Sequence, residues 1–380
     1  MKQRLRIVHC FRSPVGGIFR HVRDLAQAQV AAGHEVGIVC DSSTGGAFEQ
    51  QLMAQIEDTL PLGMRRTPMQ RHVGLGDIGA AWRTHQIIKE LKPDVLHGHG
   101  AKGGAYARLF GSLFRVSRSR VARIYSPHGG SLHYDETSVA GRLIFGTERL
   151  MGAFTDQLLF VSGYEQRTYL HKVGRPRTPY RLVYNGLRAD EFEPVETRPD
   201  AADFVYVGMM RDLKGPDLFI DALAEAARTT GRRLSAIMVG DGTDLPRYRD
   251  QAARLQDRIE VTFRPAMPAR EAFALGRVMV VPSRAEAMPY IVLEALAAGR
   301  PIIATAVGGI PEILGRDSPA LAEPSAASLA SRMADAANGG IALKAAMPPS
   351  ADLLARFSAR TMAEQIEAAY REALGEVADR

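Results

Sequence analysis

Residues 278–304 read VMVVPSRAEAMPYIVLEALAAGRPIIA. The apolar run 278–281 predicts a short buried strand, and 301–304 predicts a second one. The stretch between them holds a loop that contains Glu286 and then a helix, with Glu294 about one turn from its start. A strand, a helix and another strand in this order indicate parallel pairing with the helix packed on the sheet. Both carboxylates can therefore point into one crevice.

The same alternation runs from one end of the chain to the other. A first series of strands is predicted at 5–10, 36–40, 94–97, 123–126, 158–161 and 181–184. A second series is predicted at 204–208, 234–239, 259–263, 278–281 and 301–304. Helices are predicted between the strands, for example at 18–32 and 216–229, and a last helix at Ala359–Leu374. We therefore predict an α/β protein with two Rossmann-like, doubly wound parallel-sheet domains.

The domain boundary is expected near 187–199, where Pro194 and Pro199 lie among charged residues without clear periodicity. We assign residues 1–190 to the N-terminal domain, 191–356 to the C-terminal domain, and 357–380 to a segment that carries the last helix. The length of 380 residues agrees with two domains at roughly 150 residues each.

The composition is that of a soluble globular protein, with 46% hydrophobic and 24% charged residues, and it excludes disorder as the main state. No apolar run approaches the ~20 residues of a membrane-spanning helix. The N-terminus lacks the apolar segment of a signal peptide. Two cysteines, Cys10 and Cys40, exclude a disulfide framework and a Cys-based zinc site. We expect a cytoplasmic protein.

The formal net charge of +6 is unevenly distributed, because residues 1–190 contain 26 Lys and Arg against 15 Asp and Glu. The second half is acidic. A basic half could face anionic lipid, nucleic acid or a phosphorylated substrate. The sequence has no nucleic-acid recognition motif and no basic strand with interleaved aromatic residues, so no nucleic-acid partner is expected.

Ligands of open parallel sheets bind beyond the carboxyl ends of the strands. Gly16 and Gly17 follow the first strand and open a helix, where backbone N–H groups can approach an anion. A tight turn without a ligand explains them equally well. In the second series, Gly208 ends a strand, and Arg211 and Lys214 bracket the following turn. Two such cations suit a diphosphate, and the alternative is a pair of solvated surface cations.

Other candidates follow the neighbouring strands. Gly240 comes after 234–239 and permits close approach of a flat ring or a phosphate, although glycine is also common at the start of a loop. Glu286 and Glu294 can each accept hydrogen bonds from the hydroxyl groups of a sugar or a ribose. Alternatively, Glu294 interacts with the positive end of its helix and Glu286 is exposed.

Histidines are expected after two strands of the N-terminal domain: His97 and His99 after residues 94–96, and His128 after 123–126. Such side chains can bind a hydroxyl or a phosphate or transfer a proton, and a structural role is the alternative. Carboxylate and thiolate partners at zinc-ligand spacing are missing. There is also no Asp-x-Asp pair after a strand and no P-loop, so we expect no metal site.

Taken in order, these motifs resemble the retaining glycosyltransferases of family 4. The resemblance spans nearly the whole chain, and its most specific part is 286–299 followed by Arg300-Pro301. The other matching pieces are Val15-Gly16-Gly17, His97-Gly98-His99-Gly100, Pro127-His128-Gly129, Tyr184-Asn185-Gly186, Gly208 with Arg211 and Lys214-Gly215, Val239-Gly240-Asp241-Gly242 and Val307-Gly308-Gly309-Ile310-Pro311-Glu312.

The resemblance implies the GT-B fold, in which two domains face a central cleft and the last helix crosses back to the N-terminal domain. It implies that Arg211 and Lys214 hold the donor diphosphate, that Glu294 binds the ribose and that Glu286 contacts the transferred sugar. His128 is expected near that sugar and completes the catalytic set. Further substrate-binding residues are expected to be Gly16, Gly17, His97, His99, Asn185, Gly208, Gly240, Arg264, Ala287, Met288, Pro289 and Tyr290.

Three departures from the family pattern concern these contacts. Met209 stands where members often carry arginine, and Arg264 stands where glycine is frequent. The usual Gly-Phe-Gly after the first glutamate is Ala287-Met288-Pro289, in which the proline has no N–H to donate. These departures leave the contacts to the donor sugar undecided. They do not change the reaction class that the resemblance implies.

The function implied by the resemblance is retaining, metal-independent sugar transfer without a cofactor. The donor would be a nucleotide-diphosphate sugar, and the acceptor a glycan or a lipid-linked glycan in cell-surface polysaccharide or lipopolysaccharide biosynthesis. A nucleotide-sugar epimerase of the same fold and a non-catalytic nucleotide-sugar-binding module are the alternatives. Loops at 11–20, 128–145 and 263–268 are expected to set the nucleotide, sugar and acceptor.

One segment of the basic half, 108–120, mixes arginines with bulky apolar residues. Such a surface could rest on an anionic membrane, which would place the protein peripherally on the inner face of the cytoplasmic membrane. The alternative is an ordinary helix with its apolar side in the core and its arginines outside.

Overall fold

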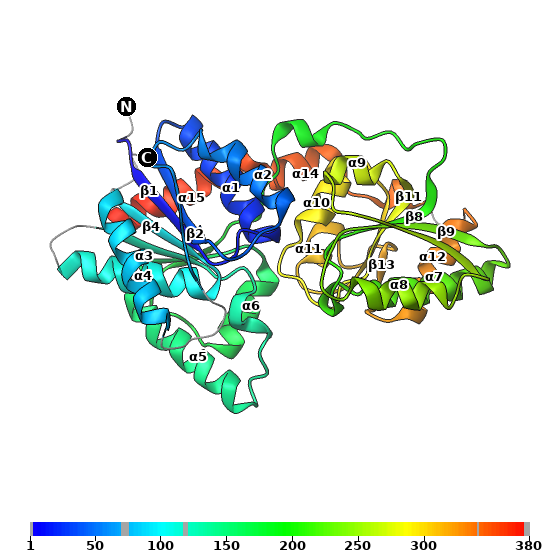
Figure 1. Ribbon diagram of the computed structural model, residues 1–380, viewed down its shortest axis with the longest axis horizontal. Helices are drawn as coiled ribbons and strands as arrows, with labels where there is room; N and C mark the ends of the chain where they lie inside the picture. Colours follow the sequence, from blue (N-terminus) through cyan, green and yellow to red (C-terminus); the bar gives the residue numbers. More distant parts are fainter. Residues whose placement is uncertain (1–2, 70–75, 117–120, 340–341, 376–380) are drawn as a thin grey trace. The chain divides into compact units, whose positions relative to one another are not determined.

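The computed structural model describes residues 3–69, 76–116, 121–339 and 342–375. The chain divides into two compact units (Figure 1). Unit 1 comprises Met1–Gly186 together with Ala359–Arg380, and unit 2 comprises Leu187–Ser358. The division falls at Gly186, a few residues before the expected position 190. The last helix starts at Ala359, as predicted, and belongs to unit 1.

Unit 1 contains a seven-stranded parallel sheet in the order β3-β2-β1-β4-β5-β6-β7. Its strands are β1 (Arg6–Phe11), β2 (Glu35–Asp41), β3 (Met64–Thr67), β4 (Val95–His99), β5 (Ala122–Ser126), β6 (Gln157–Phe160) and β7 (Tyr180–Leu182). Its helices are α1 (Gly16–Ala31), α2 (Ala47–Glu57), α3 (Gly76–Leu91), α4 (Gly100–Val116), α5 (Val139–Met151), α6 (Gly163–Lys172) and α15 (Ala359–Leu374).

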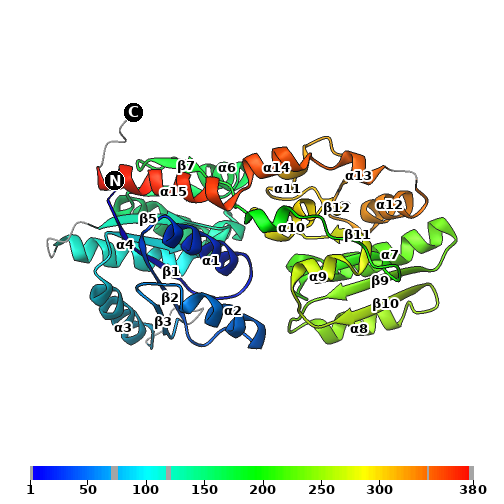
Figure 2. The same ribbon diagram turned by 90° about the horizontal axis from the view of Figure 1, so that it is seen from above.

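Different helices cover the two faces of this sheet (Figure 2). In β1, Ile7 packs in one cluster with Ile366 of α15, while Val8 packs on the other face with Phe110 of α4. On the α4 side, Tyr125 of β5 packs in a further cluster with α5 and α6. Alternation along the strand produces this division, because successive side chains point to opposite faces. Helices α3, α4 and α5 thus share a layer opposite α15.

Unit 2 contains a six-stranded parallel sheet in the order β10-β9-β8-β11-β12-β13. Its strands are β8 (Ala202–Val207), β9 (Leu234–Val239), β10 (Ile259–Arg264), β11 (Gly276–Val281), β12 (Ile302–Thr305) and β13 (Leu321–Ala322). Its helices are α7 (Pro216–Thr230), α8 (Leu245–Ala253), α9 (Ala269–Phe273), α10 (Tyr290–Ala297), α11 (Ile310–Leu314), α12 (Ala326–Ala337), α13 (Leu343–Ala346) and α14 (Ser350–Arg356).

Helix α7 shows how local sequence sets an element. Gly215 adopts a φ of 67° directly before it, Pro216 occupies its first position, and Gly231 with a φ of 66° ends it. Pro fits the first turn because the N–H it lacks has no partner there, and glycine adopts positive φ without strain. The buried stripe includes Phe219 and Leu223. The same turn places Lys214 just before the helix.

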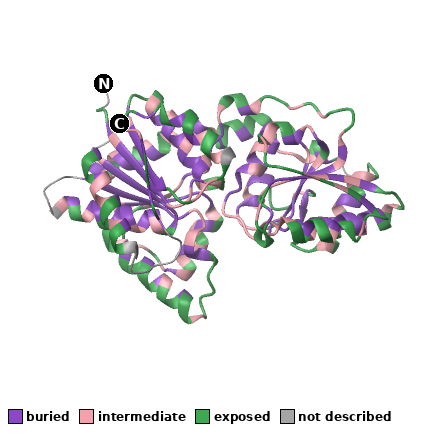
Figure 3. Cartoon of the chain, in the orientation of Figure 1, coloured by how far each residue is buried: buried purple, intermediate pink, exposed green. Residues whose placement is uncertain are grey.

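Two doubly wound sheets confirm the predicted fold class, with β3 and β13 as additional edge strands. No helix in the described part of the chain is long and apolar enough to cross a membrane. The central strands of both sheets are largely buried, and most exposed positions lie on the helices, the loops and the edge strands β3 and β10 (Figure 3).

Candidate functional site

The candidate site of unit 2 is built where three neighbouring strands end. The backbone N–H of Gly208, after β8, donates to the Val239 carbonyl at 3.0 Å, and Gly240 N donates to the Arg264 carbonyl at 3.1 Å. Gly240 adopts a φ of 148°, and a Cβ there would lie 1.9 Å from the Gly208 carbonyl oxygen. A side chain at position 240 would therefore collide with the neighbouring loop. Glycine is therefore required at position 240 for the packing of two backbone segments, and the approach of a ring or a phosphate stays a prediction.

An ion pair joins the two loops that the sequence assigned to the donor. Lys214 Nζ donates to Glu286 Oε1 at 2.6 Å. The Ser283 hydroxyl donates to the same oxygen at 2.7 Å, and Thr305 Oγ1 donates to the Ser283 carbonyl at 2.6 Å. The Lys214 side chain is 23% exposed and that of Glu286 only 8%. The ammonium is therefore fixed in a largely desolvated position, where its field is stronger than in water.

Close backbone contacts hold the Glu286 loop. A Cβ at Gly308, which has a φ of 61°, would lie 1.7 Å from the Glu286 carbonyl oxygen. A Cβ at Gly215 would lie 2.1 Å from the Pro282 carbonyl oxygen. Neither glycine can be replaced without moving the backbone beside Glu286 or Lys214.

Arg284 clamps the same loop to the start of α7. Its backbone N–H donates to the Leu213 carbonyl at 2.9 Å, and its guanidinium donates to Asp217 at 2.8 and 2.6 Å. Burial opposes ionisation of Asp217, but the hydrogen bonds and charge of Arg284 outweigh it and lower the pKa of that carboxyl. Two ion pairs, Lys214–Glu286 and Arg284–Asp217, thus hold the turn before α7 and the Glu286 loop together.

The other predicted residues of unit 2 differ in how far they are exposed. Arg211 is exposed, and its guanidinium makes no ion pair within the described residues. Glu294 is half-buried in α10. Arg264 ends β10 and is exposed. Within the loop, Ala287 is half-buried, whereas Met288, Pro289 and Tyr290 are buried, with Pro289 directly before α10.

In unit 1, the predicted glycines lie at the start of α1. Gly16 has a φ of 69° and is the first residue of the helix, and both Gly16 and Gly17 are exposed. The first N–H groups of this helix therefore face solvent next to the end of β1. This arrangement is suited to an anion, because these donors have no partner within the helix.

The histidines of unit 1 correct the sequence analysis. His97 and His99 do not follow a strand but lie inside β4, where they are 0% and 1% exposed. His128 follows β5, as expected, and is half-buried with a φ of 52°. Sequence reasoning also missed His9 and His21, which are buried beside them. A polar residue in the apolar strand β1 was the available signal for His9.

Hydrogen bonds link these rings into one chain. Gln29 Nε2 donates to the Tyr370 hydroxyl at 3.4 Å, which turns Gln29 Oε1 toward His9 Nε2 at 2.8 Å. His9 Nδ1 lies 3.0 Å from His99 Nε2, and His99 Nδ1 lies 3.0 Å from His128 Nε2. This chain of hydrogen bonds thus leads from helix α15 to the half-buried loop after β5.

The five imidazoles are held neutral. Burial lowers the pKa of His9 and His21 to about 4, although hydrogen bonds to Gln29 and Asn185 favour their charged forms. Burial, with the neighbouring histidines, holds the pKa of His97, His99 and His128 well below its usual value. Asn185 is also buried, and its Oδ1 lies 3.0 Å from His21 Nδ1.

Neutrality fixes the proton on each ring of the chain, because a neutral imidazole has one donor and one acceptor nitrogen. His9 donates through Nε2 to Gln29, so its Nδ1 accepts from His99 Nε2. His99 Nδ1 then accepts from His128 Nε2. The Nδ1 of His128 is therefore an acceptor.

A second branch fixes His97. The Tyr370 hydroxyl accepts a hydrogen bond from the Gln29 amide and donates one to His97 Nδ1 at 2.7 Å. Because His97 Nδ1 is thereby the acceptor nitrogen, His97 Nε2 donates to the Ser126 hydroxyl at 2.9 Å. The ring nitrogens of His9, His97 and His99, and those of His21, His99 and His128, lie within 4.8 Å of one another and could hold a metal ion. Hydrogen bonds account for both ring nitrogens of His9, His97 and His99 without a metal ion, and a metal-free site stays a prediction.

Glu165 supports the loop that carries His128. Its carboxylate accepts from the N–H of Gly129 and, at 2.9 Å, from that of Val161. Burial raises the pKa of Glu165 to about 7 against these two hydrogen bonds.

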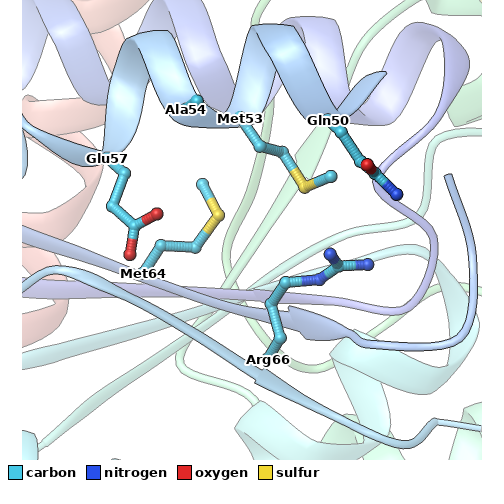
Figure 4. Close-up of a pocket in the computed structure, with 6 residues that line it drawn as sticks. All are labelled: Gln50, Met53, Ala54, Glu57, Met64 and Arg66. Atoms are coloured by element: carbon cyan, nitrogen blue, oxygen red, sulfur yellow. The ribbon is translucent and has the colours of Figure 1, made fainter. Parts of the chain in front are cut away.

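A shallow pocket elsewhere in unit 1 lies between α2 and β3 (Figure 4). Its lining residues are Gln50, Met53, Ala54, Glu57, Met64 and Arg66. The Arg66 guanidinium donates to the carbonyls of Asp41 and Thr44. These bonds explain the arginine structurally, and none of the predicted site residues lines the pocket.

Comparisons with known proteins agree with the two-unit organisation. Residues 15–191 match the family described as Glycosyltransferase Family 4, and residues 201–338 match Glycosyl transferases group 1.

Two curated relatives are each 26% identical to this chain. One subunit of the phosphatidylinositol N-acetylglucosaminyltransferase of Arabidopsis thaliana aligns over 341 residues, 85% of this chain and 72% of the relative. D-inositol 3-phosphate glycosyltransferase of Streptomyces bingchenggensis aligns over 331 residues, 78% of this chain and 71% of the relative.

The crystal structure of Anabaena Alr3699/HepE in complex with UDP and glucose has the same fold. Its TM-score is 0.76 at 18% identity, covering 98% of this chain and 100% of that one.

Proposed function

This chain belongs to the family 4, group 1 glycosyltransferases, and from that premise we propose that it transfers a sugar from a nucleotide-diphosphate sugar with retention of configuration. The observation that carries the proposal is the Lys214–Glu286 pair, with Nζ and Oε1 2.6 Å apart. The pair brings together an ammonium group that suits a diphosphate and a carboxylate that suits a sugar hydroxyl. Both groups are held by hydrogen bonds and glycine contacts before any ligand binds.

The donor is proposed to bind to unit 2 through charge and hydroxyl recognition. Arg211, which is exposed, and Lys214, which is fixed, hold the diphosphate. Glu294 accepts from the ribose hydroxyls, and Glu286 accepts from a hydroxyl of the transferred sugar. Gly240 is needed so that the Gly208 loop can lie against it, and the two glycines thereby shape the backbone on which the ligand is proposed to bind.

The reaction follows from these positions. The bond from the anomeric carbon to the diphosphate breaks, and negative charge grows on the leaving group. Preorganised cations stabilise that charge, so no metal ion and no cofactor is required. The acceptor hydroxyl forms the new bond on the same face of the sugar, and its proton goes to an oxygen of the leaving phosphate. His128, through its acceptor nitrogen, is proposed to bind a sugar hydroxyl.

A thermal-shift screen with UDP, GDP and ADP sugars tests the donor. The HepE structure, which holds UDP and glucose, makes a UDP-sugar the first choice. We expect stabilisation by one nucleotide class, and a much smaller shift for Lys214→Ala. Equal shifts for the wild type and Lys214→Ala would argue against the assigned diphosphate site.

The acceptor is proposed to be a glycan or a lipid-linked glycan of cell-surface polysaccharide or lipopolysaccharide biosynthesis. The Arabidopsis relative is named for transfer to phosphatidylinositol, which supports a lipid-linked acceptor. Release of nucleotide only after an acceptor glycan is added would separate transfer from epimerisation. A protein that binds the donor but never releases nucleotide would be a binding module instead.

The enzyme is further proposed to act peripherally at the inner face of the cytoplasmic membrane. In the segment 108–120, Arg108 is buried: it donates to Glu148 at 2.9 Å and lies 4.0 Å above the Tyr125 ring. It therefore cannot meet lipid as first expected. Leu109 and Leu113 are exposed, and residues 117–120 lie outside the described residues.

A further inference from the structure

Large apolar side chains point outward along one helix of unit 1. On α5, Val139 is 75% exposed, Leu143 68% and Leu150 67%. Spacings of four and seven residues place them on one stripe of the helix. Phe154, 37% exposed in the turn after the helix, continues the line. We call these four residues the α5 stripe.

The other side of α5 is already occupied. Phe145 and Met151 are buried against unit 1, and the Ser138 hydroxyl accepts from Gly141 N at 3.0 Å to cap the helix. The helix is therefore apolar toward the core and apolar toward solvent. The exposed side of α5 can be followed in Figure 3. A helix surface of this kind is typical of contact with a second apolar phase.

The neighbouring helix extends this surface. Leu109 and Leu113 of α4 are 44% and 53% exposed. Arg108 of α4 and Glu148 of α5 form a buried ion pair at 2.9 Å, which fixes the two helices side by side. Both cover the sheet face opposite α15, so their outward sides share one layer.

The charge of the exposed residues after the start of the stripe is mainly positive, whereas Asp135 and Glu136, just before Val139, are exposed acidic residues. Between residues 139 and 182, Glu148 is paired with Arg108, Asp156 with Arg115 and Arg123, and Glu165 is buried. All three carboxylates of that stretch are therefore either paired with an arginine or buried, and they do not offset its exposed positive charge. Its exposed arginines are Arg142, Arg149, Arg167, Arg175 and Arg177. Exposed arginines in the same stretch as an apolar stripe are complementary to a membrane that carries negative headgroups.

We propose that the α5 stripe inserts into the surface of an anionic lipid bilayer, with the surrounding arginines on the headgroups. The proposal deepens the proposed function, because it names the surface through which a lipid-linked acceptor would be approached. Water-exposed apolar area is removed on insertion, and the arginines keep their charge at the polar boundary.

The test is co-sedimentation of the full chain with phosphatidylcholine vesicles, with and without phosphatidylglycerol. We expect binding only to the anionic vesicles, weakened at high salt. Leu143→Ser with Leu150→Ser should weaken it by about tenfold or more, because both apolar contacts are lost. Arg142→Ser with Arg177→Ser should weaken it less at high salt than at low salt. The matched control is Leu354→Ser on α14 of unit 2, which is 44% exposed and should bind like the wild type.

Several outcomes would overturn the proposal. Unchanged vesicle binding by the double leucine variant is one, and equal binding to neutral vesicles is another. A dimer in sedimentation equilibrium that the same variant dissociates would assign the stripe to a second copy of this chain. The thermal shift with a UDP-sugar should be the same for wild type and stripe variants. Absence of that shift in the wild type would refute the proposed function without affecting the vesicle result.

A separate observation, the chain of neutral imidazoles, carries a second inference. Its two inner rings, His9 and His99, are fully buried, and His128 is the ring that reaches the half-buried loop. The proton positions all depend on which side of the Gln29 amide faces His9. If that amide were reversed, every ring of the chain would have to reverse with it.

The geometry points to Gln29 as a positioning residue that sets the tautomer of His128. Through His9 and His99 it keeps the proton of His128 on Nε2, so that Nδ1 accepts from a hydroxyl of the sugar. Tyr370 holds the amide in this orientation from α15. The inference rests on the proposed role of His128, but the tautomer itself can be measured without substrate.

Nitrogen NMR of the protein labelled at histidine gives the tautomer of each ring. In the wild type we expect Nε2–H at His9, His99 and His128. Gln29→Met should mix the two tautomers at His128 and lower kcat by about five- to tenfold, with the donor KM unchanged. Tyr370→Phe should act in the same direction if Gln29→Met fails to fold. An Nδ1–H tautomer at His128 in the wild type would overturn the inference, as would unaltered tautomers in both variants.

Discussion

Replacing Lys214 by alanine removes the fixed cation of the candidate donor site. The structure places its Nζ 2.6 Å from Glu286 Oε1, with the side chain 23% exposed. An ammonium ~4 Å from the leaving diphosphate, at an effective dielectric near 20, would stabilise it by about 4 kcal/mol. Residual solvent contact reduces that figure. We therefore expect kcat/KM to fall about 10²–10³-fold, as for loss of one charge-stabilising group.

The assay is transfer from the nucleotide sugar identified by thermal shift, followed as nucleotide release that depends on acceptor. Lys344→Ala is the matched control, because Lys344 is an exposed lysine of the same unit and should leave the rate unchanged. Urea unfolding of both variants checks that they are folded. Lys214→Ala also leaves the Glu286 carboxylate without its cation, so a modest loss of stability is expected.

A second variant separates the two effects of Lys214→Ala. Lys214→Ala with Glu286→Gln removes the uncompensated carboxylate and should recover stability while activity stays low. If folded Lys214→Ala retained near-normal kcat/KM, the assignment of Lys214 to the diphosphate would be wrong.

Three further predictions concern the metal, the acid range and the backbone. Activity should be unchanged in EDTA, because cationic side chains rather than a metal ion stabilise the negative charge of the leaving diphosphate. Strict dependence on magnesium would contradict this. The contribution of His9 and His21 to the free energy of unfolding should be constant above about pH 7.5 and fall between pH 6.5 and 4, because both bind protons more readily in the unfolded chain; Glu165, whose pKa burial raises to about 7, gives a smaller change of the opposite sign in this range. Linkage gives about 2 kcal/mol for each ring at pH 5, measured by urea titration, and a flat profile would refute their burial as neutral groups. Gly308→Ala should lower activity strongly by displacing the Glu286 backbone, while Gly339→Ala, whose added Cβ meets nothing within 4 Å, should not.

The proximity of Lys214 and Glu286 was predictable because both residues are close in sequence to strand ends. A parallel sheet brings those ends to one edge, so Lys214 and Glu286 meet although they are 72 residues apart. Ser283 and Thr305, which orient Glu286, were not predicted. Hydroxyl side chains are too common in loops to be recognised before their partners are known.

The histidine chain of unit 1 was not predictable to the same extent. Strand β4 continues through His99, two residues beyond the predicted end, because buried hydrogen bonds compensate the polar rings there. His97 and Tyr370 are 273 residues apart, and their contact depends on how α15 packs on the sheet. Helical periodicity predicts the helix that carries Tyr370 but could not name the polar group that its hydroxyl meets. The buried Arg108 has the same explanation, since its partner Glu148 lies on another helix.

Backbone conformation gives a further reason to connect His128 with function. A non-glycine residue at a φ of 52° is unfavourable, and such strain persists only where the surroundings enforce it. Here the surroundings include Glu165, a buried carboxylate whose two oxygens take the N–H groups of Gly129 and Val161. Desolvation raises the pKa of that carboxyl to about 7, so keeping it there costs stability. A loop that served only to connect β5 with the next segment would need neither the strain nor the buried acid. Both are explained if the orientation of the His128 ring is what the loop preserves.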